Sequence, residues 1–231
     1  MKYIGQELEN FNHASFWRKY TLSKVRCFIK NKNVLEVGSG IGSFSEILLK
    51  DVDQLTLVEP DEDYTKLLEK KFKNNSKIKK IHNGTVSKIT DEKFDVIIHF
   101  QVLEHIKEDN KEILKNLELL KNDGHLIICV PSFMSLYSKF DKSVGHHKRY
   151  IKEDFYKFDL KKNQIIKMMY IDSSGYIIYK LFKFFLNSEY PNKYMIIIWD
   201  KIFIPISIIL DWILNYKIGK NLISIIQKRD Y

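Results

Sequence analysis

Short, nearly continuous apolar runs alternate with amphipathic stretches from Asn33 onward. The runs predict β-strands, and they are NVLEVG, QLTLVE, a shorter run at 78–82, FDVIIHF and HLIICVP. The stretches predict helices at about 43–50, 62–73 and 109–120. Continuous apolar runs are typical of strands that are buried on both faces. Because strands that alternate with helices form right-handed βαβ units, we expect a doubly wound α/β fold.

The segments on either side of this core have a different pattern. Aromatic and apolar residues at roughly helical spacing predict a helical lead-in within 1–30. The stretch 176–214 predicts two amphipathic helices separated near Pro191, after a shorter helix at 152–158. The terminal NLISIIQKR predicts a last strand that pairs with QIIKMMYI (164–171). We therefore expect a mostly parallel seven-stranded sheet with an antiparallel last strand, in a single domain 1–231.

Composition and charge set limits on the partners. The chain has 231 residues, of which 45% are apolar, so it is long enough to bury a full core. A net charge of +9 permits binding to nucleic acid, an anionic membrane or a phosphorylated substrate. The lysines are spread singly along the chain, which favours a compositional habit over an RNA-binding surface. Ile202–Leu210 is uncharged but far shorter than the roughly 20 residues of a bilayer span.

The cysteines and the first residues indicate a compartment. Cys27 and Cys129 lie far apart without metal-ligand spacing, so we expect neither a disulfide framework nor a zinc site. MKYIGQELEN has no apolar stretch of the signal-peptide kind. We therefore expect a cytoplasmic protein.

A glycine-rich turn follows the first predicted strand, in VLEVGSGIGSF (34–44). Glycines at 38, 40 and 42 allow a sharp turn and a close approach of ligand to main chain. A dinucleotide fingerprint would place its third small residue at 43, where Ser43 stands, and no P-loop GK[ST] follows. The spacing E-x-G-x-G-x-G is closer to a loop that binds S-adenosylmethionine. The alternative is a turn that only packs helix on strand.

An acidic residue, Glu59, ends the second predicted strand about twenty residues after that turn. A carboxylate there can accept hydrogen bonds from both ribose hydroxyls, although it could also be a solvated strand end. The carboxyl ends of the strands line the crevice where such folds bind ligands. We expect Gly38, Glu59, 84–86 and 100–101 to converge there.

Four motifs in order resemble those of class I S-adenosylmethionine-dependent methyltransferases: VLEVGSGIG, VEPD, FDVIIHFQVLEHI and LKNDGHLIICVP. The resemblance implies a cofactor-binding core at 31–135 and an acceptor-side segment at 136–231, with a helical insertion at 176–214 and the terminal strand. GHHKRY (145–150) and GKNLISIIQKR resemble a bacterial subgroup associated with small molecules and cell-surface glycans.

The resemblance also implies which residues bind S-adenosylmethionine. The methionine part would contact Glu36, Gly38, Ser39, Gly40 and Gly42. The ribose and adenosine would contact Glu59, Pro60 and Asp61. Many members bind adenine through an acidic residue after the third strand, but this chain has NGTVSKI there, so Thr85 or Val86 would take that role. Gln101 and His105 would lie beside the cofactor and the methyl-transfer site, and Phe100, at the end of the same predicted strand, would also contact the cofactor.

Methyl transfer mainly requires alignment of the acceptor and, for a hydroxyl, a base. Imidazole is suited to that task, so the catalytic candidates are His105, His146 and His147, and we favour His146 because GHHKRY can fold over the cofactor. Arg149 and Tyr150 are expected to bind an anionic acceptor. A surface basic loop is the alternative for GHHKRY, and a helix-capping pair is the alternative for Glu104 and His105. Metal-independent transfer is expected.

The expected reaction is methyl transfer to a hydroxyl or amine of a small molecule, plausibly a sugar or surface-glycan precursor. RNA methylation is an alternative that rests only on charge, and the N-P-P-[YF] motif of base methylation is absent. A third alternative is a fold that binds cofactor or partner without catalysis. The insertion 176–214 could be a lid, a dimer surface or a peripheral membrane contact. Monomer and homodimer both stay open.

Overall fold

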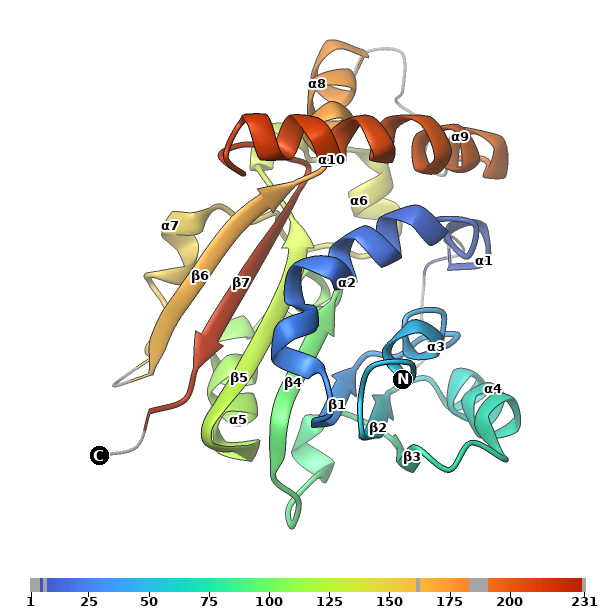
Figure 1. Ribbon diagram of the computed structural model, residues 1–231, viewed down its shortest axis with the longest axis vertical. Coiled ribbons are helices and arrows are strands. Elements are labelled where there is room, and N and C mark those ends of the chain that lie inside the picture. The colour runs from blue at the N-terminus through green and yellow to red at the C-terminus, as the bar shows by residue number, and fades with distance from the viewer. Residues whose placement is uncertain (1–4, 6–7, 161–162, 183–190, 230–231) are drawn as a thin grey trace.

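A seven-stranded sheet with helices on both faces forms the protein in our computed structural model (Figure 1), which describes residues 5, 8–160, 163–182 and 191–229. The strands are β1 Asn33–Val37, β2 Gln54–Glu59, β3 Ile78–Asn83, β4 Phe94–Phe100, β5 Leu120–Pro131, β6 Gln164–Ile171 and β7 Asn221–Gln227. The helices are α1 Leu8–Phe11, α2 Ser15–Ile29, α3 Ser45–Leu48, α4 Glu62–Phe72, α5 Asp109–Leu119, α6 Lys139–Ser143, α7 Lys152–Phe155, α8 Ser173–Phe182, α9 Lys193–Ile198 and α10 Ile204–Ile213.

The strand order is β3-β2-β1-β4-β5-β7-β6. All neighbouring pairs are parallel except the two that involve β7, which is antiparallel to both β5 and β6. This confirms the doubly wound α/β fold and the antiparallel last strand. The expected pairing of the terminal strand with 164–171 is also confirmed, with Asn221 opposite Ile171 and Gln227 opposite Gln164.

Two apolar layers hold the helices against the sheet. On one face, α2, α3 and α4 contribute residues such as Val25, Leu48 and Leu68 to a core that also contains Ile204 of α10. On the other face, α5 and α7 pack through residues such as Leu117. Because β1, β4 and β5 have both faces covered, their sequences are apolar at successive positions instead of alternating.

Some elements are shorter or longer than the apolar pattern predicts. The helix expected at 43–50 is α3, only Ser45–Leu48, because residues 38–44 form the glycine turn, in which Gly42 N–H donates to the Ser39 carbonyl over 2.9 Å. The helix expected at 152–158 is α7, which ends at Phe155. β5 begins at Leu120, where a helix was expected to end, since Leu120 pairs with Phe94 of β4.

The C-terminal helices lie across the end of the sheet where β5 and β6 finish and β7 begins (Figure 1). The two helices expected within 176–214 are α8 and one long run in which a π-turn, Trp199–Phe203, joins α9 to α10; residues 183–190 lie outside the described residues. Pro205 follows the π-turn and cannot donate a backbone hydrogen bond, which explains why the α-helical ladder is interrupted there. In the part of the chain described, no helix is long and apolar enough to cross a membrane.

Two buried aspartates fix this long run to the rest of the molecule. Asp200 accepts hydrogen bonds from the backbone N–H groups of Phe16 (3.0 Å) and Trp17 (2.8 Å), at the start of α2. Asp211 accepts from the Tyr20 hydroxyl over 2.7 Å and from the backbone that leads into α8. The first N–H groups of a helix have no acceptor within the helix, so Asp200 of the α9–α10 run supplies acceptors to α2, on which the run also packs.

Candidate active site

A cavity of about 870 Å³ opens at the carboxyl ends of β1, β2 and β4. β1 lies between β2 and β4, so the strand order reverses there, which is where doubly wound sheets bind ligands. Most predicted site residues line this cavity: Glu36, Gly38, Ser39, Gly40, Glu59, Pro60, Thr85, Val86, Phe100, Gln101, His105, His146 and Arg149. Gly42, Asp61, His147 and Tyr150 do not.

The glycine turn forms the floor of the cavity. Gly38, Gly40 and Gly42 all have positive φ, at 69°, 51° and 75°. A Cβ on Gly38 would lie 2.6 Å from Val102, and one on Gly42 would lie 2.7 Å from Leu68. Gly42 therefore packs the turn against α4, whereas Gly38 and Gly40 present main chain to the cavity.

Two buried carboxylates flank this turn. Glu59 accepts hydrogen bonds from Gly40 N–H (2.7 Å) and Asp61 N–H (2.9 Å), yet burial outweighs these bonds and raises its pKa. Glu36 accepts from the Ser45 hydroxyl over 2.6 Å. Burial, with the nearby Glu59 as a smaller contribution, raises the pKa of Glu36 to about 8. The floor of the cavity thus holds a pair of carboxyl groups that favour a positively charged or hydrogen-bond-donating ligand.

Asp61 has a local task outside the cavity. Its carboxylate accepts hydrogen bonds from the backbone N–H groups of Asp63 (2.9 Å) and Tyr64 (3.1 Å), which makes it the N-cap of α4. By capping α4, Asp61 fixes the chain directly after Glu59.

The wall near β4 contains an aromatic stack and a strained residue. The Phe44 and Phe100 rings stack with centroids 3.7 Å apart. Gln101 has φ +55°, and its Nε2 donates to Asn221 Oδ1 of β7 over 3.2 Å. The Thr85 and Ser87 hydroxyls are hydrogen-bonded at 2.7 Å on the side of β3. These contacts fix the side chains that line the cavity between β3 and β7.

A buried ion pair with a histidine forms the opposite side of the cavity. Arg149 donates from Nε and Nη2 to the two oxygens of Asp141, at 2.9 and 3.0 Å. The His146 ring bonds Asp141 through Nδ1 at 2.8 Å. Burial alone would raise the pKa of Asp141, but His146 and Arg149 outweigh it and hold that pKa well below its usual value. Asp141 is therefore ionised and fixes the orientation of the His146 imidazole.

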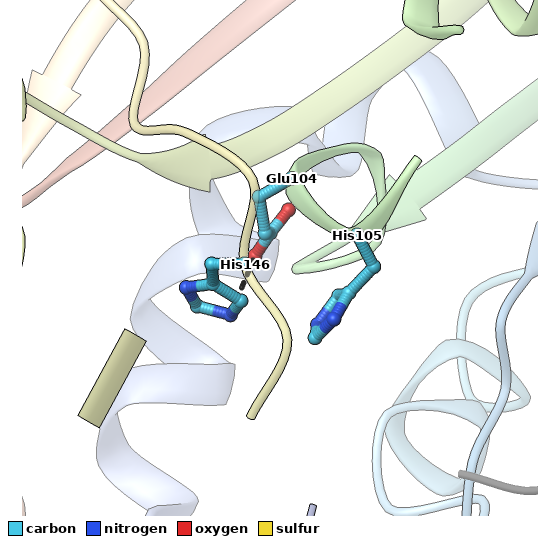
Figure 2. Close-up of side chains that lie close together, drawn as sticks. All are labelled: Glu104, His105 and His146. Atoms are coloured by element: carbon cyan, nitrogen blue, oxygen red, sulfur yellow. Dashed lines mark ion pairs between the residues drawn. The ribbon is translucent and has the colours of Figure 1, made fainter. Parts of the chain in front are cut away.

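Glu104 and His105 face this histidine from the 3₁₀ turn that follows β4, and Figure 2 shows the Glu104 carboxylate directed at the His146 ring. His146 Nε2 lies 3.8 Å from Glu104 Oε1. Burial raises the pKa of Glu104 to about 7, and burial, reinforced by His146 and His147, lowers that of His105 to about 3. Neither Glu104 oxygen receives a hydrogen bond from another residue in the described chain, so Glu104 does not cap α5.

His147 and Tyr150 lie away from the cavity. His147 is exposed, and its backbone N–H donates to the Glu104 carbonyl over 2.8 Å. Tyr150 is fully buried, and its hydroxyl donates to the Leu103 carbonyl (3.2 Å) and to Asp109 (3.0 Å). The Tyr150 side chain and the His147 backbone therefore hold the loop around the cavity, and neither side chain lines the cavity.

Several cavity residues have no signal in the sequence. Phe140 and Trp199 line the cavity beside Phe11 of α1, and Lys220 and Asn221 come from the point where β7 begins. Asp141, which holds both His146 and Arg149, lies in the unremarkable segment KFDKS. In the sequence, only the spacing of five residues between Asp141 and His146 indicates that the two side chains could meet.

Comparison with known proteins agrees with this geometry. A family profile described as a methyltransferase domain matches residues 13–172. No curated protein sequence matches the chain.

Solved structures share the fold at low identity. The N-methyltransferase NodS from Bradyrhizobium japonicum, in complex with S-adenosyl-L-homocysteine, is 14% identical over 98% of this chain and 94% of its own, with a TM-score of 0.64. Coclaurine N-methyltransferase, bound to N-methylheliamine and S-adenosylhomocysteine, is 12% identical over 99% of this chain and 82% of its own, with a TM-score of 0.63. The [4+2]-cyclase SpnF is 13% identical over 94% of this chain and 81% of its own, with a TM-score of 0.62.

The cyclase among these structures shows that the fold alone does not fix the reaction. The assignment therefore rests on the family profile, which spans well over half of the chain, together with the glycine turn and Glu59 at the carboxyl edge of the sheet. The chain belongs to the class I S-adenosylmethionine-dependent methyltransferases.

Proposed function

We propose that the protein transfers a methyl group from S-adenosylmethionine to a hydroxyl or amine of a small molecule. The observation that carries this proposal is the cavity itself, which joins the glycine turn and Glu59 on one side to the buried cluster of Asp141, His146 and Arg149 on the other. The resemblance of GHHKRY to a glycan-associated subgroup supports a sugar or surface-glycan precursor as the acceptor.

The cofactor would be held mainly by main chain and carboxylates. Gly38, Ser39 and Gly40 bring backbone to the methionine part, and the Glu36 carboxylate is placed to pair with its ammonium group. Glu59 uses one lone pair of each oxygen on backbone N–H groups, which leaves lone pairs for ribose hydroxyls. Thr85 supplies a hydroxyl and main chain near the adenine.

When bound, the cofactor supplies a methyl group on a cationic sulfur: the acceptor lone pair forms the new bond to carbon while the S–C bond breaks and its electrons stay on sulfur. The protein must align the acceptor and remove its proton. Asp141 holds His146 through Nδ1, so Nε2 is the atom that can accept that proton. Arg149 uses two of its nitrogens on Asp141, so we assign it to positioning Asp141 and not to binding the acceptor.

Calorimetric titration with S-adenosylhomocysteine, with NAD as control, tests the cofactor assignment. We expect micromolar binding of the first and none of the second. Transfer of labelled methyl to a panel of sugars and amines then tests the reaction. His146→Asn should lose turnover with its S-adenosylhomocysteine affinity unchanged, while the control His125→Asn on β5 keeps both. An inability to bind S-adenosylhomocysteine would refute the proposal, and full turnover in His146→Asn would remove His146 from catalysis.

The α9–α10 run has an exposed apolar stripe, which bears on the chemical class of the acceptor. Isoleucines at intervals of three and four residues are exposed along it, at Ile198, Ile202, Ile206, Ile209 and Ile213. The two acidic residues of the run, Asp200 and Asp211, are fully buried, so its exposed charges are Lys193 and Lys201. An apolar stripe with only basic charge beside it matches an anionic lipid surface.

We propose that this stripe rests on an anionic membrane and that the acceptor is hydrophobic or lipid-linked, since Trp199 of the same run lines the cavity. The wild type should co-sediment with vesicles that contain phosphatidylserine and not with neutral ones. Ile202→Ser combined with Ile209→Ser should abolish that binding, whereas Ile177→Ser on α8 should not. The wild type could instead fail to bind vesicles and form a dimer in light scattering that the double substitution breaks. That result would contradict the proposed membrane contact and identify the stripe as a dimer interface.

A further inference from the structure

Three side chains with metal-ligating atoms meet at the acceptor side of the cavity. Glu104, His105 and His146 each offer one ligand atom, and these atoms lie within 4.8 Å of one another. Figure 2 shows that Glu104 and His105 come from consecutive positions of one turn, while His146 comes from a separate loop. His105 and His146 line the cavity, so a site among the three atoms has an open side.

The Glu104 carboxylate is buried and has no hydrogen-bond donor among the described residues. Its side chain is fully buried, and neither oxygen receives a hydrogen bond from another described residue. The nearest cationic candidate is His146 Nε2, at 3.8 Å, which is beyond hydrogen-bond distance. Removing a carboxylate from water without hydrogen-bond donors is unfavourable, and a bound cation would offset that loss.

The distances fit an ion after a small adjustment. Three atoms no more than 4.8 Å apart share a point within about 2.8 Å of each, and metal bonds to nitrogen and oxygen measure about 2.0 to 2.2 Å. Side-chain rotations that move each atom by roughly 0.6 Å would therefore close the site.

The second layer of contacts also suits metal binding. His146 Nδ1 is held by Asp141, and Asp141 is held by Arg149, so Nε2 points into the cluster. The His105 ring hydrogen-bonds the Val144 backbone. A histidine whose other nitrogen is fixed by a carboxylate or carbonyl is the usual arrangement around protein-bound metals.

We propose that Glu104, His105 and His146 bind a divalent transition-metal ion such as Zn²⁺, with its remaining positions open to the acceptor. Two imidazoles and one carboxylate suit Zn²⁺, Fe²⁺ or Mn²⁺ better than Mg²⁺ or Ca²⁺. This deepens the proposed function and rests on it for the acceptor. His146 Nε2 then holds the ion, the ion takes over the activation of a bound acceptor hydroxyl, and the proton leaves to solvent. It replaces the expectation of metal-independent transfer.

The test uses the 231-residue chain without an affinity tag, after removal of metal with a chelator. Titration with Zn²⁺ should show one ion per chain, and Co²⁺ should give visible absorption of a coordinated site. Glu104→Gln and His105→Asn should each weaken Zn²⁺ binding at least tenfold, whereas His147→Asn, at the exposed neighbouring histidine, should leave it unchanged. Circular dichroism confirms that the variants fold.

S-adenosylhomocysteine binding is measured on the same samples and is expected to be unaffected by the chelator. Zn²⁺ binding that is absent, or that persists in both Glu104→Gln and His105→Asn, would overturn the metal site while leaving the methyltransferase proposal intact. Loss of S-adenosylhomocysteine binding with Zn²⁺ binding retained would instead refute the proposed function alone.

Discussion

The two halves of the cavity are built in different ways. The cofactor half comes from short contiguous segments, 36–44 and 59–60, and uses backbone groups and carboxylates at strand ends. The acceptor half comes from segments far apart in the chain, at 104–105, 140–149, 199 and 220–221, and depends on side-chain ion pairs. The first half follows from the fold, whereas the second can change with the substrate while the fold stays the same.

The largest expected effect tests the acceptor half. Arg149→Ala should lower the free energy of unfolding by about 3–5 kcal/mol, because the buried Asp141 carboxylate would lose its guanidinium partner and keep only its bonds to His146 and Ser138. The matched control is Arg26→Ala, whose guanidinium pairs with Asp51 but is 61% exposed, and it should cost at most about 1 kcal/mol. Urea denaturation measures both, and equal losses would mean that the buried pair does not hold this half together.

The next effect tests the cofactor half. Glu59→Ala should weaken S-adenosylhomocysteine by about 1–3 kcal/mol, roughly 5- to 150-fold in Kd, because two ribose hydrogen bonds are lost. Glu62→Ala, three residues further on and exposed on α4, should bind as the wild type does. Calorimetry compares them, and a Glu59→Ala affinity within twofold of the wild type would remove Glu59 from the site.

A smaller effect sharpens the boundary between the halves. Tyr150→Phe should cost about 0.5–1.5 kcal/mol of stability, since it removes one buried hydroxyl and its bonds to Leu103 and Asp109. The acceptor KM and the S-adenosylhomocysteine Kd should not change, because Tyr150 does not line the cavity. A tenfold rise in KM would return Tyr150 to the acceptor site predicted from GHHKRY.

The last effect depends on pH and concerns Glu36. Burial raises its folded-state pKa to about 8 from the ordinary 4.5, so the folded protein binds the additional proton between these values. The contribution of Glu36 to stability is therefore full below pH 4.5 and is lost as the pH rises to about 8. Glu36→Gln should differ little from the wild type at pH 4.5 and become progressively more stable than the wild type as the pH rises to 9 in thermal unfolding. Parallel pH profiles would show that Glu36 titrates normally.

The sequence predicts the cofactor half well because its signals are local. A buried strand, a glycine turn and an acidic strand end are consecutive in the chain, and the sheet brings them together by topology alone. The acceptor half lacks such a signal. Asp141 owes its role to Arg149 and His146, and the Glu104 cluster depends on how the loop at 144–149 folds back over the turn after β4. Such contacts depend on side-chain packing, which periodicity does not encode.

The π-turn at Trp199–Phe203 joins three parts of the molecule within one turn. Trp199 lines the cavity and donates to Asp172, while Asp200 completes the start of α2. The same turn contains Ile202 of the exposed isoleucine stripe, and it ends two residues before Pro205, which removes a hydrogen bond from the helical ladder. One turn of helix therefore holds both an isoleucine of the exposed stripe and an indole of the cavity wall, so a substitution that reshapes this turn would alter the outer surface and the cavity together.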